Sequence, residues 1–180
     1  VYVTDTTSET NNVQKFTKNG TFVTSWNISR ITDDPFTNAR GIGIDSLNNV
    51  YVTGGASPNT AVQKFTNNGT FVSSWGSTGL GDGEFTSPAW VTIDSADNVY
   101  VGDFGENNRI QKFDSNGTFI TAWGNLGFGP GTFTSPAGID VDKSKNNIYI
   151  ADFGSPDTAV QVFTNNGTFV TSWGSTGLGD

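Results

Sequence analysis

Short runs of alternating apolar and polar residues recur along the chain. Four apolar triplets begin at positions 1, 50, 99 and 148, at a spacing of 49 residues. In the third copy, alternating segments at 89–94, 99–101, 109–113 and 118–123 predict four short strands separated by polar turns. Sustained helical periodicity is absent from the sequence. The pattern therefore predicts an all-β chain built from a repeated four-stranded antiparallel unit.

Repeats of this length are typical of propellers, solenoids and arrays, and four-stranded sheets repeated around an axis form a β-propeller. The chain opens on the second strand of a unit, so we predict three complete blades and a first blade that lacks its first strand. The predicted blades span residues 1–36, 37–85, 86–133 and 134–180.

Near-identity between the second and fourth copies suggests recent duplication. Residues 163–180 match residues 65–82 at 17 of 18 positions. We therefore expect the chain to be a window of a longer array. A ring completed by self-association is the alternative. Near-identical blades offer the same surface several times, which favours a structural or multivalent binding role over catalysis.

The turns carry the most specific local signals. Asn-Gly occurs in the last turn of every unit and predicts type I′ hairpins. Asp45, Asp94 and Asp142 end the first strand of a unit and are expected to bond the backbone of the following turn. The Trp and Phe residues of the repeated F-x-x-x-W segment are expected to share one strand face and, with the repeated Tyr, to fill the space between blades.

Four of the Asn-Gly sites are followed by Thr and are therefore candidate N-glycosylation sites, although Asn-Gly also suits a turn. A fifth candidate, Asn-Ile-Ser, stands where other copies have Gly after Trp. The candidate acceptors are Asn19, Asn27, Asn68, Asn116 and Asn166.

The sequence resembles the NHL repeat family over essentially its whole length, most specifically in the third copy. Residues 136–142 read Pro-Ala-Gly-Ile-Asp-Val-Asp, and residues 98–103, 108–113 and 117–124 supply the rest of the motif. The other copies replace Asn-Arg-Ile by Asn-Val or Ala-Val. The resemblance implies a propeller, most often of six blades, with the first strand of each blade innermost and a chief use as an interaction platform.

The composition limits which partners, metal ions and catalytic groups the chain could use. The formal net charge is −8, with nine Lys and Arg against 17 Asp and Glu, which disfavours nucleic acid as a partner. The absence of His and Cys removes the usual zinc ligands and the commonest general base. Asp140 and Asp142 lie two residues apart on the innermost strand and could together bind a cation. The equivalent pairs in blades two and three contain only one carboxylate each, so negative charge does not accumulate there. We therefore expect no metal, no cofactor and no membrane span.

Loops carry function when a rigid scaffold presents them. Because strands alternate in direction, the loops after the second and fourth strands of each unit share one face, and variation is concentrated there. On or beside this face we expect a binding surface, and its candidate residues are Arg40, Trp90, Phe104, Arg109 and Phe153.

These observations favour a non-enzymatic propeller segment, extracellular or at the cell surface, that acts as a scaffold or binding platform. Its expected partners are a protein or glycan on that loop-bearing face and further copies of the repeat in the same or another chain. The alternative is a calcium-dependent hydrolase or lactonase-like enzyme whose remaining residues lie outside this window.

Overall fold

The computed structural model describes residues 1–6, 11–28, 36–55, 61–154 and 159–175. These residues form strands, turns and loops, and no helix occurs among them. The strands are β1 (Tyr2–Thr6), β2 (Asn11–Phe16), β3 (Phe22–Asn27), β4 (Thr37–Ile44), β5 (Val50–Gly55), β6 (Val62–Phe65), β7 (Phe71–Trp75), β8 (Ser77–Thr78), β9 (Glu84–Phe85), β10 (Pro88–Ile93), β11 (Val99–Asp103), β12 (Arg109–Phe113), β13 (Phe119–Trp123), β14 (Pro136–Asp142), β15 (Asn147–Asp152), β16 (Val160–Thr164) and β17 (Phe169–Trp173).

Four antiparallel sheets follow one another along the chain. Blade one contains β1-β2-β3, blade two β4-β5-β6-β7, blade three β10-β11-β12-β13 and blade four β14-β15-β16-β17. We letter the strands of a complete blade a to d, so that β1, β2 and β3 correspond to b, c and d. The short strands β8 and β9 pair in parallel within the connection between blades two and three.

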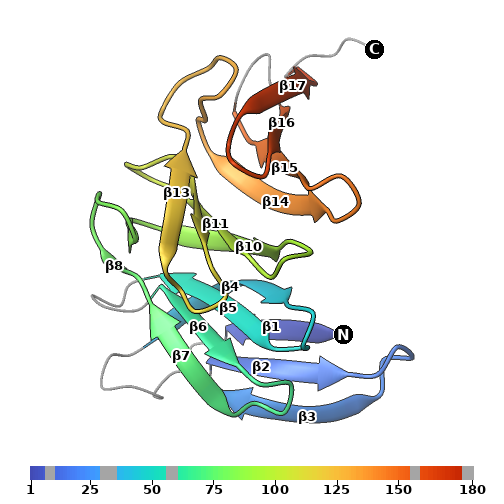
Figure 1. Ribbon diagram of the computed structural model, residues 1–180. Helices are drawn as coiled ribbons and strands as arrows, with labels where there is room; N and C mark the ends of the chain where they lie inside the picture. The colour runs from blue at the N-terminus through green and yellow to red at the C-terminus, as the bar shows by residue number, and fades with distance from the viewer. Residues whose placement is uncertain (7–10, 29–35, 56–60, 155–158, 176–180) are drawn as a thin grey trace.

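The blades succeed one another in an arc, from blue at the bottom of Figure 1 to red at the top. The a strands of successive blades lie against one another, with β4 contacting β10 and β10 contacting β14. In blade one, strand b takes this place and β1 contacts β4. The predicted all-β propeller is confirmed, with three complete blades and one that lacks its a strand.

The c–d turns differ from the prediction. A type I′ turn needs positive φ at both central residues. Here the Gly20 N–H donates to the Thr17 carbonyl at 3.2 Å, and Gly20 alone of the Asn-Gly pair has positive φ, at 78°. The turn is thus followed by a glycine with left-handed backbone, Gly20. A bulge comes next, because Lys15 pairs with Thr24 and Phe16 with Phe22, which leaves Val23 of β3 unpaired. The type I′ prediction is wrong at all four sites, since only the glycines are left-handed.

The same bulge changes which face the aromatic residues occupy. In blade two one extra residue of β7 lies between the partners of Lys64 and Phe65. Alternation therefore shifts, so that Phe71 packs between blades one and two while Trp75 packs between blades two and three. The prediction that Phe and Trp of the F-x-x-x-W segment share a face is wrong.

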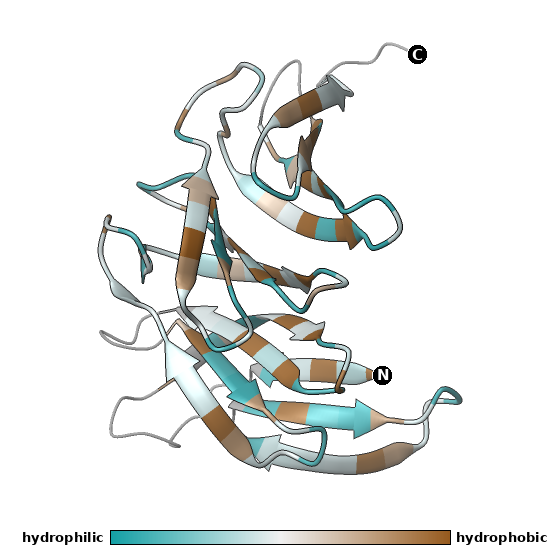
Figure 2. Cartoon of the chain, viewed as in Figure 1, coloured by the Kyte–Doolittle hydropathy of each residue, from teal (hydrophilic) through white to brown (hydrophobic). Residues whose placement is uncertain are grey.

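The apolar core lies between the blades and is divided into three clusters, one at each contact. Figure 2 shows the alternating bands of apolar and polar residues that produce it. In each contact the Trp of strand d lies near the Phe of strand c in the next blade. The ring centroids are 6.1 Å apart for Trp26 and Phe65, 6.0 Å for Trp75 and Phe113, and 5.9 Å for Trp123 and Phe163. The prediction that aromatic residues fill the space between blades is confirmed at these contacts.

A polar contact accompanies each apolar one. The ammonium of strand c donates to a backbone carbonyl in the c–d turn of the next blade, at 2.9 Å in all three cases. The pairs are Lys15 with Asn67, Lys64 with Ser115, and Lys112 with Asn165. Each ammonium also lies 5.0–5.4 Å from the ring centroid of the strand b Tyr in its own blade. Successive blades are therefore joined by one repeated arrangement.

The a–b turns are fixed by the aspartates singled out from the sequence. Asp94 accepts from the N–H groups of Ala96 and Asn98, both at 2.9 Å, and from the Tyr100 hydroxyl at 2.9 Å. Asp45 repeats this arrangement, and Asp142 accepts from the N–H of Ser144. The predicted role of these aspartates in the turns is confirmed.

Candidate interaction surface

Because the strands of each blade are antiparallel and adjacent in chain order, the b–c and d–a loops lie at one end of the blades and the a–b and c–d hairpins at the other. We call the first end the loop face. Its described loops comprise residues 76–87, 104–108, 124–135 and 153–154. All the predicted binding residues lie on it or at its border.

In blades three and four, a buried carboxylate fixes the junction between the preceding d–a loop and the b–c loop. Asp103, at the end of β11, accepts from the N–H of Thr86 at 3.0 Å, the N–H of Ser87 at 2.8 Å and the side-chain amide of Asn107 at 2.6 Å. Burial raises the pKa of this carboxyl above its ordinary value, against the opposing effect of these hydrogen bonds. The loops are thereby tied to the sheet.

Asp152 plays the same part in blade four, accepting from the N–H groups of Thr134 at 3.0 Å and Ser135 at 2.7 Å. Neither Asp103 nor Asp152 was singled out from the sequence. The available signal was their shared position, two residues after the repeated apolar triplet in both copies.

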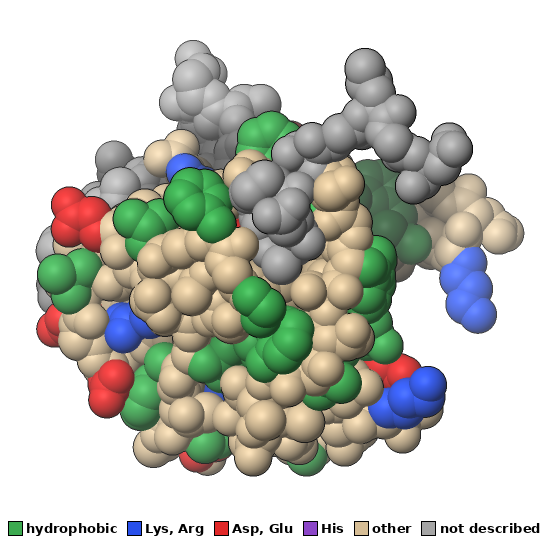
Figure 3. All heavy atoms as spheres, turned by 90° about the horizontal axis from the view of Figure 1, so that it is seen from above, with side chains coloured by type: hydrophobic (Ala, Val, Ile, Leu, Met, Phe, Trp, Pro, Cys, Tyr) green, Lys and Arg blue, Asp and Glu red, His purple; other side chains and the backbone are tan. Residues whose placement is uncertain are grey.

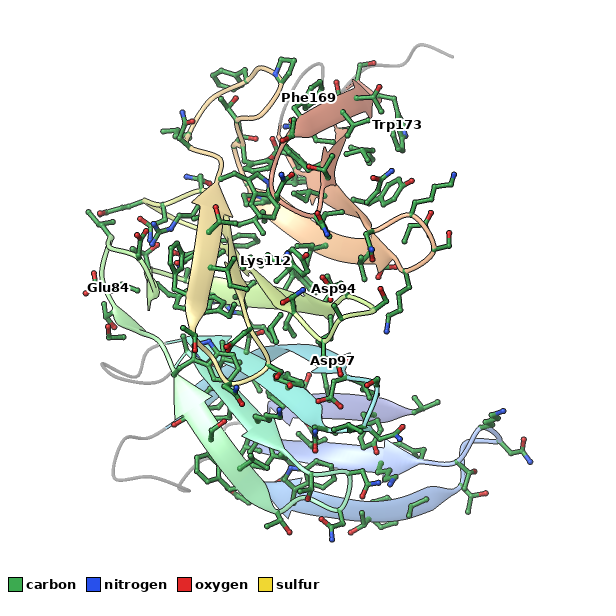
Figure 4. All side chains as sticks on the ribbon, viewed as in Figure 1. Glu84, Asp94, Asp97, Lys112, Phe169 and Trp173 are labelled. Carbon is green, nitrogen blue, oxygen red and sulfur yellow. The ribbon has the colours of Figure 1, made fainter. Side chains whose placement is uncertain are left out.

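Arg109 belongs to the fold rather than to a free surface. Its Nη2 donates to the carbonyls of Gly81 at 2.6 Å and Glu84 at 2.9 Å, and so holds the d–a loop before blade three. The Glu84 carboxylate, labelled in Figure 4, accepts from the Gly81 N–H at 2.8 Å within the same loop. Arg109 is half-buried, and its hydrogen bonds stabilise the surface on which it was expected to act.

Arg40 and Phe104 both form a hydrogen bond with Ser87, and Trp90 lies three residues further along the chain. The exposed Arg40 of β4 donates from Nη1 to the Ser87 hydroxyl at 2.9 Å, across the contact between blades two and three. The Phe104 N–H donates to the Ser87 carbonyl at 3.1 Å. Trp90 follows on β10, opposite Gly102 at a break in register, with 39% of its surface exposed.

Phe153 lies apart from this group, on blade four. Its N–H donates to the Ser135 carbonyl at 2.9 Å, so its backbone is fixed, while 79% of its surface is exposed. Leu126 and Phe128 in the adjoining d–a loop are 66% and 65% exposed. The sequence analysis missed these two residues because they lie in a glycine-rich stretch that lacks strand periodicity.

The candidate glycosylation sites Asn19, Asn68, Asn116 and Asn166 lie on the c–d turns, at the end opposite the loop face, and all are exposed. The Asn68 side-chain carbonyl accepts from the hydroxyls of Thr66 and Thr70. Asn27, the last residue of β3, is exposed as well.

Within the part of the chain that the structure describes, no group of three or more acidic or histidine side chains is placed to hold a metal ion. The same residues include no apolar helix long enough to span a bilayer.

Comparison with known proteins supports the fold. A family described as a 6-bladed beta-propeller (DUF5128) matches residues 97–156. A comparison with curated protein sequences finds no match.

Solved structures extend the similarity to most of the chain. One is a nidogen/laminin complex, with a TM-score of 0.63, 15% identity and coverage of 95% of this chain and 60% of that one. Another is hydrazine synthase from Kuenenia stuttgartiensis, with a TM-score of 0.67, 10% identity and coverage of 96% and 45%. A third is a gluconolactonase from Xanthomonas campestris, with a TM-score of 0.51, 13% identity and coverage of 79% and 42%. The chain spans between 42% and 60% of the length of these structures, and the likeness shows that it has a β-propeller fold.

Proposed function

We propose that the chain is part of a non-enzymatic, NHL-type propeller that binds a protein or glycan partner through the loop face. The observation that carries the proposal is the exposure of Phe153, Phe128 and Leu126 on loops whose backbone is fixed by hydrogen bonds, some of them to the buried Asp152 carboxylate. Exposed apolar groups gathered on a rigid surface are typical of interaction sites.

The chemistry of this surface favours a partner with apolar or ring-shaped groups. Phe153 and Phe128 offer aromatic faces, which pack on apolar side chains or on the C–H faces of sugars. Arg40 adds a cation at the inner border of the surface, whereas Arg109 is already engaged within the fold. The acidic chain as a whole favours neutral or cationic partners.

The proposed location is extracellular or at the cell surface. The candidate acceptors on the c–d turns lie at the end away from the loop face, so glycans attached there leave the loop face uncovered. Mass spectrometry of the native protein tests this part of the proposal. Peptides that carry hexose on Asn68 or Asn166 are expected, and exclusively bare asparagines at all five sites contradict it.

Binding is tested with the variants Phe153→Ser and Phe128→Ser against a panel of immobilised defined oligosaccharides and purified secreted proteins. Leu47→Ser is the matched control, because Leu47 is 76% exposed on an a–b turn at the opposite end. A bound panel member is expected to lose about tenfold in affinity with either Phe variant, which corresponds to about 1.4 kcal/mol, and nothing with the control. Equal affinities in all three variants, or a panel without any binder, overturn the proposal.

The calcium-dependent hydrolase or lactonase-like alternative stays a prediction with a separate test. An ion that binds only the folded state raises the melting temperature of the protein. Melting measured with added Ca²⁺ and with a chelator separates the two functions. A calcium-dependent rise favours the enzyme, and identical melting curves favour the platform.

A further inference from the structure

Charged residues are divided unevenly between the two ends of the blades. We call the end opposite the loop face the hairpin face, because it carries the a–b and c–d turns. All six lysines of the sequence lie in these turns or on the second-last residue of the strand before a c–d turn. They are Lys15, Lys18, Lys64, Lys112, Lys143 and Lys145. Six aspartates accompany them there, so the formal charges of the described hairpin face cancel. They are Asp45, Asp94, Asp97, Asp114, Asp140 and Asp142.

The described part of the loop face is acidic. Six carboxylates lie there against two arginines, Arg40 and Arg109, which gives a formal charge of −4. The carboxylates are those of Asp5, Asp82, Glu84, Asp103, Glu106 and Asp152. Figure 3 shows Lys and Arg side chains projecting at one border of the view, while Asp and Glu side chains are spread along the opposite border. The formal negative charge of the described residues therefore belongs to the loop face.

Two d–a loops of this face display an apolar side chain at the same position. Leu80, between blades two and three, is 59% exposed, and Phe128, between blades three and four, is 65% exposed. Each stands between two glycines, in the segments Gly-Leu-Gly and Gly-Phe-Gly. The two loops therefore present one repeated apolar contact.

A buried glutamine of the next blade fixes the backbone of each of these loops. Gln111 accepts from the Gly83 N–H at 2.9 Å and donates to the Glu84 carbonyl at 2.7 Å. Gln161 forms the same pair of hydrogen bonds with the second loop, at 2.8 Å and 2.6 Å. Both glutamines are fully buried. Because the loops are already held in place, a partner that packs on them loses little free energy in ordering them.

Exposed carboxylates flank the first of the two apolar residues. Asp82 follows Leu80 by two residues, and Glu106 lies on the adjoining b–c loop. This b–c loop contacts the d–a loop through Asn107, whose side-chain amide donates to the Gly79 carbonyl at 3.1 Å. In the second loop the residue equivalent to Asp82 is a proline. The loop face thus offers one apolar contact with negative charge beside it and one without.

We propose that the loop face binds a cationic segment of a partner protein, whose apolar side chains pack on Leu80 and Phe128 and whose Lys or Arg side chains lie beside Asp82 and Glu106. Charge complementarity selects this occupant, because nucleic acids and acidic glycans are repelled and a neutral glycan gains nothing from the carboxylates. Arg109 offsets only one carboxylate of this junction, and its Nη2 is engaged by two loop carbonyls. The inference rests on the function proposed above, since it names the partner of the same face.

The probe is a short capped peptide of alternating Lys and Leu, titrated against the 180-residue chain. Three matched peptides replace Lys by Glu, Lys by Ser, or Leu by Ser. The Lys–Leu peptide is expected to bind most tightly, the two Ser-containing peptides more weakly, and the Glu–Leu peptide most weakly. Equal affinities for the Lys–Leu peptide and either Ser-containing peptide overturn the proposal, as do tighter binding of the Glu–Leu peptide and the absence of binding by all four.

Apolar variants assign the contact to the two loops. Leu80→Ser and Phe128→Ser are each expected to weaken binding of the Lys–Leu peptide about tenfold, as the loss of one buried apolar side chain does. Because this term is not electrostatic, the loss is expected at low and at high salt. Leu47→Ser, on the hairpin face, is the matched control and is expected to bind as wild type does. Loop variants that bind like this control overturn the proposal.

A charge variant tests the acidic surroundings separately. Asp82→Asn/Glu106→Gln is expected to bind the Lys–Leu peptide about fivefold more weakly than wild type in about 0.05 M salt and equally in about 1 M salt, because salt screens exposed charges. Leu47→Lys, which adds a positive charge at the hairpin face, is expected to bind as wild type does. No loss at low salt, or a loss that persists at high salt, overturns the proposed charge pairing.

The outcome also separates this inference from the proposed function. Should the peptides fail while a neutral oligosaccharide or protein of the panel above binds and loses affinity in Phe128→Ser, the cationic partner is overturned and the binding platform stands. Should both the peptides and the panel fail, both proposals are overturned.

Discussion

The Trp75 indole of blade two lies against the backbone of Gly117 in the c–d turn of blade three, where an added Cβ atom would sit 2.6 Å from its Cδ2 atom. Gly117 also has a φ of 88°, which side chains other than glycine rarely adopt. Two separate requirements thus fall on one residue, one from the turn and one from the neighbouring blade.

The two requirements are separated by comparing Gly117→Ala with Gly20→Ala. Both variants bear the strain of a left-handed alanine, about 1–2 kcal/mol. Gly117→Ala in addition forces its methyl group against Trp75, which is expected to cost about 1–3 kcal/mol more in the free energy of unfolding. Urea denaturation of the two variants, measured at low concentration, checks this. Equal losses would mean that Trp75 moves aside without cost.

The hydroxyl of Tyr100 is expected to contribute to the contact between blades three and four. It donates to Asp94 at 2.9 Å and lies 3.2 Å from the Asn165 carbonyl of the next blade. Tyr100→Phe removes the donor and should reduce the free energy of unfolding by about 1–2 kcal/mol, since one hydrogen bond goes to a charged group. Tyr149→Phe is the control, because no acceptor for the Tyr149 hydroxyl occurs among the described residues. Thermal and urea unfolding should show a larger loss of stability for Tyr100→Phe than for Tyr149→Phe.

The strand pattern of the repeat was predictable because each blade buries both faces against its neighbours, which imposes the same apolar positions on every copy. The place of the missing strand followed from the register of the first triplet alone. The Asp turns were predictable too, because an aspartate before a tight turn satisfies N–H groups only two and four residues away.

The bulge in the c–d hairpin was not predictable from alternation. Asn-Gly fits both a type I′ turn and a turn followed by a left-handed glycine, and only the pairing of Phe65 with Phe71 distinguishes them. Strand alternation predicted that the b–c and d–a loops share one end of the blades, but it did not predict the hydrogen bonds of Arg109, because its acceptors lie 25 and 28 residues earlier in the chain. Local sequence patterns carry no information on such contacts.

Acid is expected to weaken the contact between the a–b turns of blades two and three. Asp97, labelled in Figure 4 between the two blades, accepts hydrogen bonds from the hydroxyl of Ser46 at 2.6 Å and from the N–H of Ser46 at 2.8 Å. These hydrogen bonds lower the pKa of the Asp97 carboxyl. Because the folded-state pKa lies below the unfolded one, the stabilisation is complete above about pH 4 and is lost as the pH falls through the folded-state pKa.

Asp97→Asn should therefore reduce the free energy of unfolding near neutral pH and reduce it less in acid, where wild type has also lost the contact. Ser46→Ala should flatten the same part of the pH profile, since it removes the main cause of the shift. Chemical denaturation at several pH values checks both variants. A constant difference between wild type and Asp97→Asn across the profile would assign the acid dependence to other carboxylates.

Arg109 is expected to stabilise the d–a loop before blade three while contributing little to the stability of the whole fold. The equivalent residues in blades two and four are Ala61 and Ala159, so the blade itself accommodates alanine at this position. Arg109→Ala removes the hydrogen bonds to Gly81 and Glu84, and amide exchange at residues 79–84 should accelerate while global stability changes little. Arg40→Ala is the control, because Arg40 donates to the Ser87 hydroxyl, outside residues 79–84, and its loss should leave exchange at 79–84 unchanged. If exchange in 79–84 is the same in both variants, the Glu84 carboxylate and the β8–β9 pair suffice to fix the loop.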